Sequence, residues 1–175
     1  MYRNVIIMVT IASCLLVGNA FCADWKYYGE FTSAPGIQKV TFYDSNSIIR
    51  NNNSVKLWVK IVLYSDIEKS LENKLVIENA KKKIAKGYSP PIAKIYPNAT
   101  TAAYLEEAVN ETTVKYNAEI LYEIMCDNNK LRKISGASFN KNGTRDQRFG
   151  ITRWEDIVPE SNAENLAKIL CGSKL

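Results

Sequence analysis

The sequence predicts an α+β domain of about six strands with packed helices. Three observations lead to this expectation. Apolar and polar residues alternate in several segments, the alternation changes to a four-residue spacing over residues 67–86, and Asn142-Gly143 marks a hairpin between two strand segments. A chain of 175 residues, of which 46% are hydrophobic and 23% charged, suits one folded domain of ordinary size.

Alternation also orders the strands along the chain. The expected strands cover residues 24–31, 39–44, 55–64, 116–126, 130–139 and 144–151. The clearest is 55–64, whose odd-numbered residues are all apolar and must face the core, whereas its other face includes Lys56, Trp58 and Lys60. For 116–126 a helix is a competing interpretation, because glutamate, leucine and methionine favour helices.

Three segments have the features of helices. Residues 67–86 carry an apolar stripe and end in Lys81-Lys82-Lys83, which suits a helix C-terminus; these lysines could also contact an anionic ligand or lipid headgroup, although a solvated helix end is favoured. Three prolines in eight residues predict a loop after this helix, and a shorter helix over 100–109 follows. Ser161 and Glu164 form a capping box for a terminal helix that ends at Cys171.

The first 23 residues have the layout of a secretory signal peptide. A short N-terminal segment with Arg3 precedes an apolar run, which is followed by small residues typical of a cleavage site. We therefore expect cleavage after Ala20 or Ala23 and one domain over residues 24–175. Ile11-Ala12-Ser13-Cys14 also satisfies a lipobox, but Cys14 lies inside the apolar run. A soluble periplasmic protein is therefore favoured over a lipid-anchored outer-membrane or surface protein, and membrane attachment is expected only if Cys14 is lipidated.

Composition excludes several kinds of chemistry. The chain contains no histidine, which rules out Ser-His-Asp and Cys-His catalysis as well as histidine-containing zinc sites. Its net charge of +5 is spread along the chain and does not form the basic patch that is typical of nucleic-acid-binding proteins. Glu119 and Glu123, the best carboxylate pair, would lie about 14 Å apart on a strand, too far for a glycosidase pair. We expect no enzyme and no cofactor.

Cysteine use predicts one covalent link. With Cys14 and Cys22 in the leader, Cys126 and Cys171 remain as an even pair in an exported domain and most economically form a disulfide; two separate buried thiols are the alternative. Such a bond would pin the terminal helix against the sheet.

The ordered set of motifs resembles the surface-adhesin protein E family of Gram-negative bacteria. The resemblance covers residues 25–65 and 115–172, and its most specific block runs from Trp154 through Pro159 and Leu166 to Cys171. It implies an antiparallel sheet, a disulfide between Cys126 and Cys171, and binding of host matrix or serum proteins as in the best-known members. No binding residue can be transferred to the region 66–114.

These expectations combine into a functional prediction. We expect an exported cell-envelope protein that binds a protein or a surface polymer without catalysis; the alternative is a periplasmic structural or assembly accessory with a bacterial envelope partner. The candidate binding residues are Lys56, Trp58, Lys60, Lys81, Lys82 and Lys83. The competing interpretation of Trp58 is a core residue beneath the 67–86 helix.

Overall fold

The computed structural model describes residues 23–33, 36–72, 74–91, 99–111, 116–140 and 142–172. The predicted leader, with Cys14, Ala20 and Cys22, lies outside the described residues except for Ala23, and so does the 92–98 part of the predicted loop. Within the described ranges, no helix is both long and apolar enough to cross a membrane.

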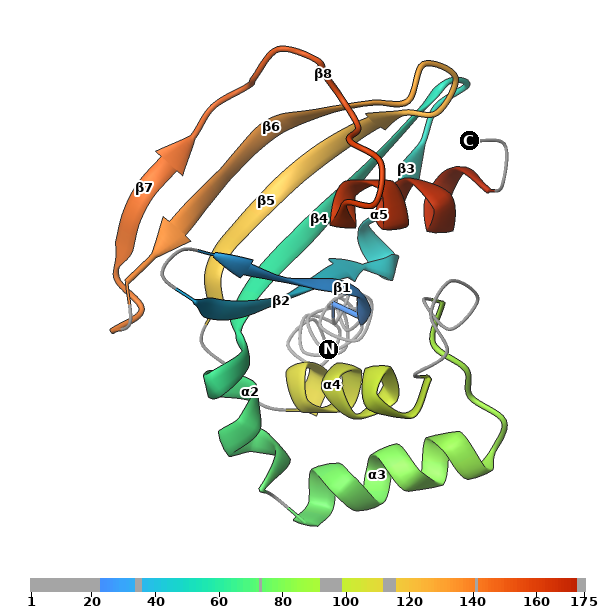
Figure 1. The fold of residues 1–175 in the computed structure, drawn as a ribbon, viewed down its shortest axis with the longest axis vertical. Helices are drawn as coiled ribbons and strands as arrows, with labels where there is room; N and C mark the ends of the chain where they lie inside the picture. The colour runs from blue at the N-terminus through green and yellow to red at the C-terminus, as the bar shows by residue number, and fades with distance from the viewer. Residues whose placement is uncertain are drawn as a thin grey trace, which may run out of the picture.

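The fold is α+β, as the sequence predicts, with helices packed against an antiparallel sheet (Figure 1). The strands are β1 (Trp25–Ser33), β2 (Ile37–Asp44), β3 (Ile49–Arg50), β4 (Ser54–Leu63), β5 (Tyr116–Met125), β6 (Lys130–Phe139), β7 (Arg145–Phe149) and β8 (Glu155–Asp156). The helices are α2 (Tyr64–Leu71), α3 (Lys74–Ala85), α4 (Ala99–Glu111) and α5 (Asn162–Cys171), with a 3-10 turn η1 (Ser45–Ser47). The long strands follow the order β1-β2-β4-β5-β6-β7, while β3 pairs with β4 and β8 with β6.

The structure corrects two expectations and decides a third. The described sheet has eight strands, not about six, because β3 and β8 span only two residues each and are too short to show alternation. The helix predicted over 67–86 is two helices, α2 and α3, and the first of them begins earlier, at Tyr64. The segment that begins at residue 116 is the strand β5 and not a helix. Its residues pair with β4 on one side and with β6 on the other.

The face of the sheet that bears the odd-numbered residues of β4 packs against α5. Val55, Leu57 and Val59 are all at most 3% exposed, which confirms the predicted core face for this part of the strand, whereas Ile61 and Leu63 are only half-buried. The first three form one core cluster with Leu166 and Leu170 of α5. Burying such side chains contributes about 1.5–3 kcal/mol each.

The opposite face is covered at one end only. Phe42 and Val62 pack there against Ile67, Val76 and Leu105, which come from α2, α3 and α4. These three helices gather at the β1–β2 end of the sheet (Figure 1). The middle of β4, β5 and β6 extends beyond them, and none of the described helices lies above that part of the face (Figure 1).

The terminal helix is fixed at both of its ends. At its start, Ser161 Oγ accepts the Glu164 amide at 3.2 Å, and Glu164 Oε2 accepts the amide of Glu160 at 3.0 Å. The N-cap half of the predicted capping box is therefore present. The reciprocal half is not formed, because the Glu164 carboxylate binds the amide of Glu160, while the Ser161 amide donates to Val158 O at 3.3 Å. At its end, Cys171 is bonded to Cys126, and the predicted disulfide is confirmed.

Gly136 is required by the close approach of two central strands. A Cβ at this position would lie 2.5 Å from Glu119 O and 2.9 Å from Ile120 Cα, both backbone atoms of β5. We expect Gly136→Ala to lower the free energy of unfolding by about 1–3 kcal/mol, as overpacking does in other cores. Urea denaturation monitored by circular dichroism measures this loss.

Gly150 offers a matched control for that substitution. A Cβ at Gly150 meets nothing within 4 Å, so Gly150→Ala should leave stability unchanged or slightly raised. Equal effects of the two substitutions would contradict the steric explanation for Gly136.

Candidate functional site

Three rows of side chains cross the face of the sheet opposite α5, and strand register creates all three. Each row passes from one strand to the next through directly paired residues. The rows are Lys60–Glu119–Ala137–Arg148, Trp58–Leu121–Ser135 and Lys56–Glu123–Arg132. Because directly paired residues point to the same side of a sheet, each row forms a continuous strip. We call the ten residues of these rows the open sheet face.

The row through Glu123 is held rigidly by ion pairs. Glu123 is 5% exposed, and its Oε2 accepts hydrogen bonds from Arg132 Nε at 2.8 Å and Nη2 at 2.5 Å, while Ser54 Oγ donates to Oε1. Lys56 Nζ lies 3.6 Å from the same carboxylate. Burial works against the charge, but the hydrogen bonds from Arg132 and Ser54 outweigh it and lower the pKa of Glu123. Lys56 is therefore an ion-pair partner here.

Trp58 borders a hollow in the open sheet face. The hollow has a volume of about 290 Å³ and is lined by Trp58, Glu119, Ser135, Gly136, Ala137, Phe139, Arg145 and Arg148. The hollow lies between Trp58 of β4 and the two arginines of β7, where β6 contributes the small residues Ser135, Gly136 and Ala137 in addition to Phe139. We call this space the outer hollow. Trp58 also packs against the margin of the second core cluster, so part of its ring is structural.

Lys60, one row further along the open sheet face, contacts aromatic rings. Its Nζ lies 4.0 Å from the ring centroid of Trp25 and 4.7 Å from that of Tyr116, which places the ammonium between two aromatic rings. Burial lowers the pKa of Lys60, and the nearby Glu119 partly offsets this effect. Such cation–π contacts are worth up to about 2 kcal/mol when water is excluded.

A second hollow lies at the other end of the same face. It has a volume of about 540 Å³, and its lining residues are Arg50, Asn51, Asn52, Asn53, Ser54, Glu123, Met125 and Trp154. The guanidinium of Arg132 stacks 4.4 Å from the Trp154 ring centroid. We call it the Trp154 hollow. Both hollows thus combine a tryptophan with arginine: the outer hollow is lined by Arg145 and Arg148, and the Trp154 hollow by Arg50, whose Nη1 donates to Leu170 O at 2.7 Å.

The lysines of α3 form no part of this surface. Lys81 and Lys82 are exposed on a helix that packs mainly against α4. Lys83 Nζ lies 2.5 Å from Glu107 Oε2, a contact that has ion-pair distance without hydrogen-bond alignment. Glu107 is 1% exposed, so Lys83 neutralises a buried charge. The structure therefore brings Lys56, Trp58 and Lys60 together on one face and leaves Lys81–Lys83 apart from them.

A buried polar cluster closes the outer edge of β1. Glu106 of α4 is 3% exposed, and its carboxylate accepts the Tyr27 amide at 3.0 Å and the Tyr88 hydroxyl. Lys26 Nζ donates to the Tyr88 oxygen at 3.1 Å. One helical turn further along α4, the Asn110 side chain accepts a hydrogen bond from the Trp25 amide and donates one to the Trp25 carbonyl. Two α4 side chains thus take the place of a neighbouring strand along the first half of β1.

Burial changes the proton affinity of this cluster. It raises the pKa of Glu106 to about 7, although the hydrogen bond from Tyr88 and the charge of Lys26 act in the opposite direction. Burial also raises the pKa of Tyr88, and the carboxylate beside it adds to that rise. Glu106 therefore changes protonation near neutral pH, where exposed carboxyl groups are already ionised.

Several of these residues escaped the sequence analysis. Arg145 and Arg148 lie in a short exposed strand without apolar alternation, and Trp154 lies in a loop. The available signal was the run of small residues over 135–138, which opens space in a strand. Among the described residues, no group of three acidic or cysteine side chains is placed to hold a metal ion.

Comparison with protein-family models, curated proteins and solved structures gives no match. The resemblance to the surface-adhesin protein E family therefore remains an expectation from the sequence motifs.

Proposed function

We propose that the chain is an exported, non-catalytic binding module that holds an extended acidic partner, a protein segment or a surface polymer, along the open sheet face. The observation that supports this most is the pairing of two hollows on one face, each with a tryptophan and at least one arginine. Aromatic rings and guanidinium groups are the side chains that contribute most at binding surfaces.

The spacing of the hollows suits an extended chain better than a compact ligand. Glu119 lines the outer hollow and Glu123 the Trp154 hollow, four residues apart on β5. This separation corresponds to about 14 Å along a strand. A peptide of about four or five residues, or a short run of sugar units, spans that distance.

Charge favours an acidic partner. Glu119 lies beside Lys60, and Glu123 is neutralised by Arg132, whereas no ion pair involving Arg145 or Arg148 occurs among the described residues. Arginine binds carboxylates, sulfates and phosphates through two parallel hydrogen bonds. The two β7 arginines therefore offer the free donors of this face.

Export is the second part of the proposal. The leader pattern of residues 1–23 supports it, and so does the Cys126–Cys171 disulfide, because such bonds persist mainly in oxidising compartments. The resemblance to surface adhesins points in the same direction. Edman sequencing and intact mass of the protein recovered from an expressing bacterium report the cleavage position and any lipid.

Removing the two free arginines should weaken binding sharply. With a fluorescein-labelled hexaglutamate peptide as the probe and with polygalacturonate as competitor, we expect R145A/R148A to bind the probe at least tenfold more weakly than the parent protein. Each lost charge-assisted hydrogen bond is worth about 1.5–3 kcal/mol. Fluorescence anisotropy at low and at physiological ionic strength measures the change.

The double variant K81A/K82A is the matched control, because it removes the same charge from exposed positions on α3. We expect its affinity to stay within twofold of the parent protein. An equal loss in both variants would mean that net charge alone drives binding, and a loss confined to K81A/K82A would move the site to α3. Absence of saturable binding by either polyanion would contradict the proposed acidic partner.

A further inference from the structure

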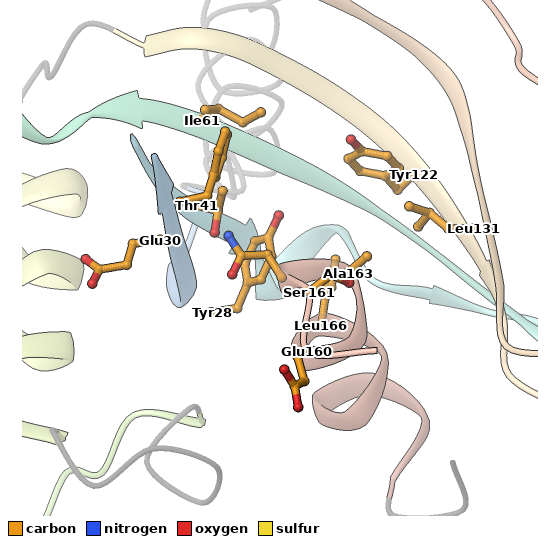
Figure 2. Close-up of a pocket in the computed structure, with 12 residues that line it drawn as sticks. Tyr28, Glu30, Thr41, Ile61, Tyr122, Leu131, Glu160, Ser161, Ala163 and Leu166 are labelled. Carbon is orange, nitrogen blue, oxygen red and sulfur yellow. The ribbon is translucent and has the colours of Figure 1, made fainter. Parts of the chain in front are cut away.

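A third cavity lies on the other side of the sheet, between its inner face and the start of α5 (Figure 2). We call it the inner pocket. Its volume is about 420 Å³, within the range of small-molecule sites. The walls come from five strands and one helix, with Tyr28 from β1, Thr41 from β2, Ile61 from β4, Tyr122 from β5, Leu131 from β6 and Leu166 from α5.

A β-bulge in β1 shapes one wall of the inner pocket. The register of β1 on β2 shifts between Tyr27 and Gly29, which sets Tyr28 against the core. Gly29 has no side chain, and Asn162 occupies the space: a Cβ at Gly29 would lie 2.2 Å from Asn162 Oδ1. The glycine therefore allows the first residue of α5 to reach the sheet.

Asn162 brings an unused hydrogen-bond donor to this wall. Its Nδ2 is buried and has no hydrogen-bond partner among the described residues, although Asn162 lines the pocket. A buried donor without a partner costs about 1–3 kcal/mol. An acceptor atom on a bound molecule would recover that free energy.

The two charged residues that line the pocket are acidic, whereas Lys39 Nζ lies outside the lining, 5.9 Å from the ring centroid of Phe31. Glu30 and Glu160 are lining residues, none of the twelve lining residues is basic, and both carboxylates point outward from the cavity (Figure 2). Glu30 Oε2 accepts a hydrogen bond from the neutral Gln38 side-chain amide at 3.1 Å, and this contact does not neutralise its charge. At the start of α5, the Ser161 hydroxyl already caps the Glu164 amide. The entrance therefore favours a cation over an anion.

We propose that the inner pocket binds a small amphipathic amine. The apolar or aromatic body lies against Tyr28, Tyr122 and Leu166, the ammonium group lies at the entrance near Glu30 and Glu160, and a hydrogen-bond acceptor on the body meets Asn162. This site is separate from the open sheet face and does not depend on its function.

Two probes with the same body test the charge preference. In titrations of the purified ¹⁵N-labelled protein, we expect 4-methoxyphenethylamine to shift the side-chain amide signal of Asn162 and the backbone signals of Ala163 and Thr41. We expect 4-methoxyphenylacetate to bind at least tenfold more weakly, because two carboxylates oppose it. Phenethylamine, which lacks the ether oxygen, should leave the Asn162 side-chain signal nearly unchanged.

Three variants connect the probe to the pocket. Ala163→Phe fills the cavity and should abolish binding of the amine, while E30Q/E160Q should weaken it at least fivefold and remove the preference over the acid. E68Q/E78Q removes two exposed charges from α2 and α3 and should bind like the parent protein. The dispersion of the spectrum shows directly whether each variant is folded.

Each remaining outcome overturns the proposal. Equal binding of the amine and the acid would exclude the charge argument, and binding retained by Ala163→Phe would place the amine elsewhere. No saturable shift of pocket signals with any probe at millimolar concentration would exclude the site itself.

Discussion

Replacing Cys126 and Cys171 together by alanine should lower the free energy of unfolding by about 4 kcal/mol. The bond joins residues 45 positions apart, and a loop of that length restricts the unfolded chain by about this amount in the chain-entropy model. It also attaches the end of β5 to the end of α5, whose Leu166 and Leu170 belong to the same core cluster. Urea denaturation in the absence of reductant measures the loss.

The parent protein in excess reductant provides the control for this prediction. Its unfolding curve should move toward that of the double variant, while reductant should leave the variant unchanged. The intact masses of the oxidised and reduced protein should differ by two hydrogens. A loss below about 1 kcal/mol would contradict a stabilising role for the bond.

Raising the pH from about 4.5 to above 7 should remove up to about 3 kcal/mol of stability through Glu106. Burial raises the pKa of this carboxyl in the folded protein to about 7, from an ordinary value of 4.5. Between these two values the folded state holds a proton that the unfolded state has released, so the free energy of unfolding falls as the pH rises. Each unit of difference corresponds to 1.36 kcal/mol.

Other carboxyl groups act in a lower pH range and with the opposite sign. Burial opposes the charges of Asp24 and Glu123, but their hydrogen bonds and cationic neighbours prevail and lower both pKa values. These two groups therefore contribute stability above their ordinary pKa and lose it as the pH falls. Taken with Glu106, they predict greatest stability in mildly acidic solution.

The variant Glu106→Gln tests whether Glu106 alone causes the loss of stability between about pH 4.5 and pH 7. A glutamine can still accept the Tyr27 amide and contact Tyr88, so the edge of β1 stays closed while the titration disappears. Denaturation at pH 5 and pH 8 should then give nearly equal stabilities after subtraction of the remaining pH dependence. Glu78→Gln, at an exposed position of α3, should retain the parent profile; equal profiles for all three proteins would contradict the assignment.

The sequence was a good guide to the parts of the fold that local patterns determine. The alternation in 55–64 correctly divides β4 into a buried and a partly open face, and Ser161 with Glu164 marks the start of the terminal helix. The even number of cysteines after the leader predicts the disulfide. In these cases the decisive information lies within about ten residues or in a simple count.

Long-range contacts decide the features that sequence analysis missed. Glu106 follows alanines and a leucine on a helix, and nothing near it shows that Tyr27, 79 residues away, will supply its buried partner. Likewise, Arg148 joins the row of Lys60 only because β4, β5, β6 and β7 pair in one register. The two-residue strands β3 and β8 also exist only through such pairing.

The disulfide also determines how the domain carries mechanical load. A pull on the backbone beyond Cys171 passes through the sulfur bridge directly to Cys126 at the end of β5. Residues 127–170 then form a closed loop outside the line of tension. β6, β7 and α5 lie in that loop, so the β7 arginines and the helix beside the inner pocket stay in place while the central strand bears the force.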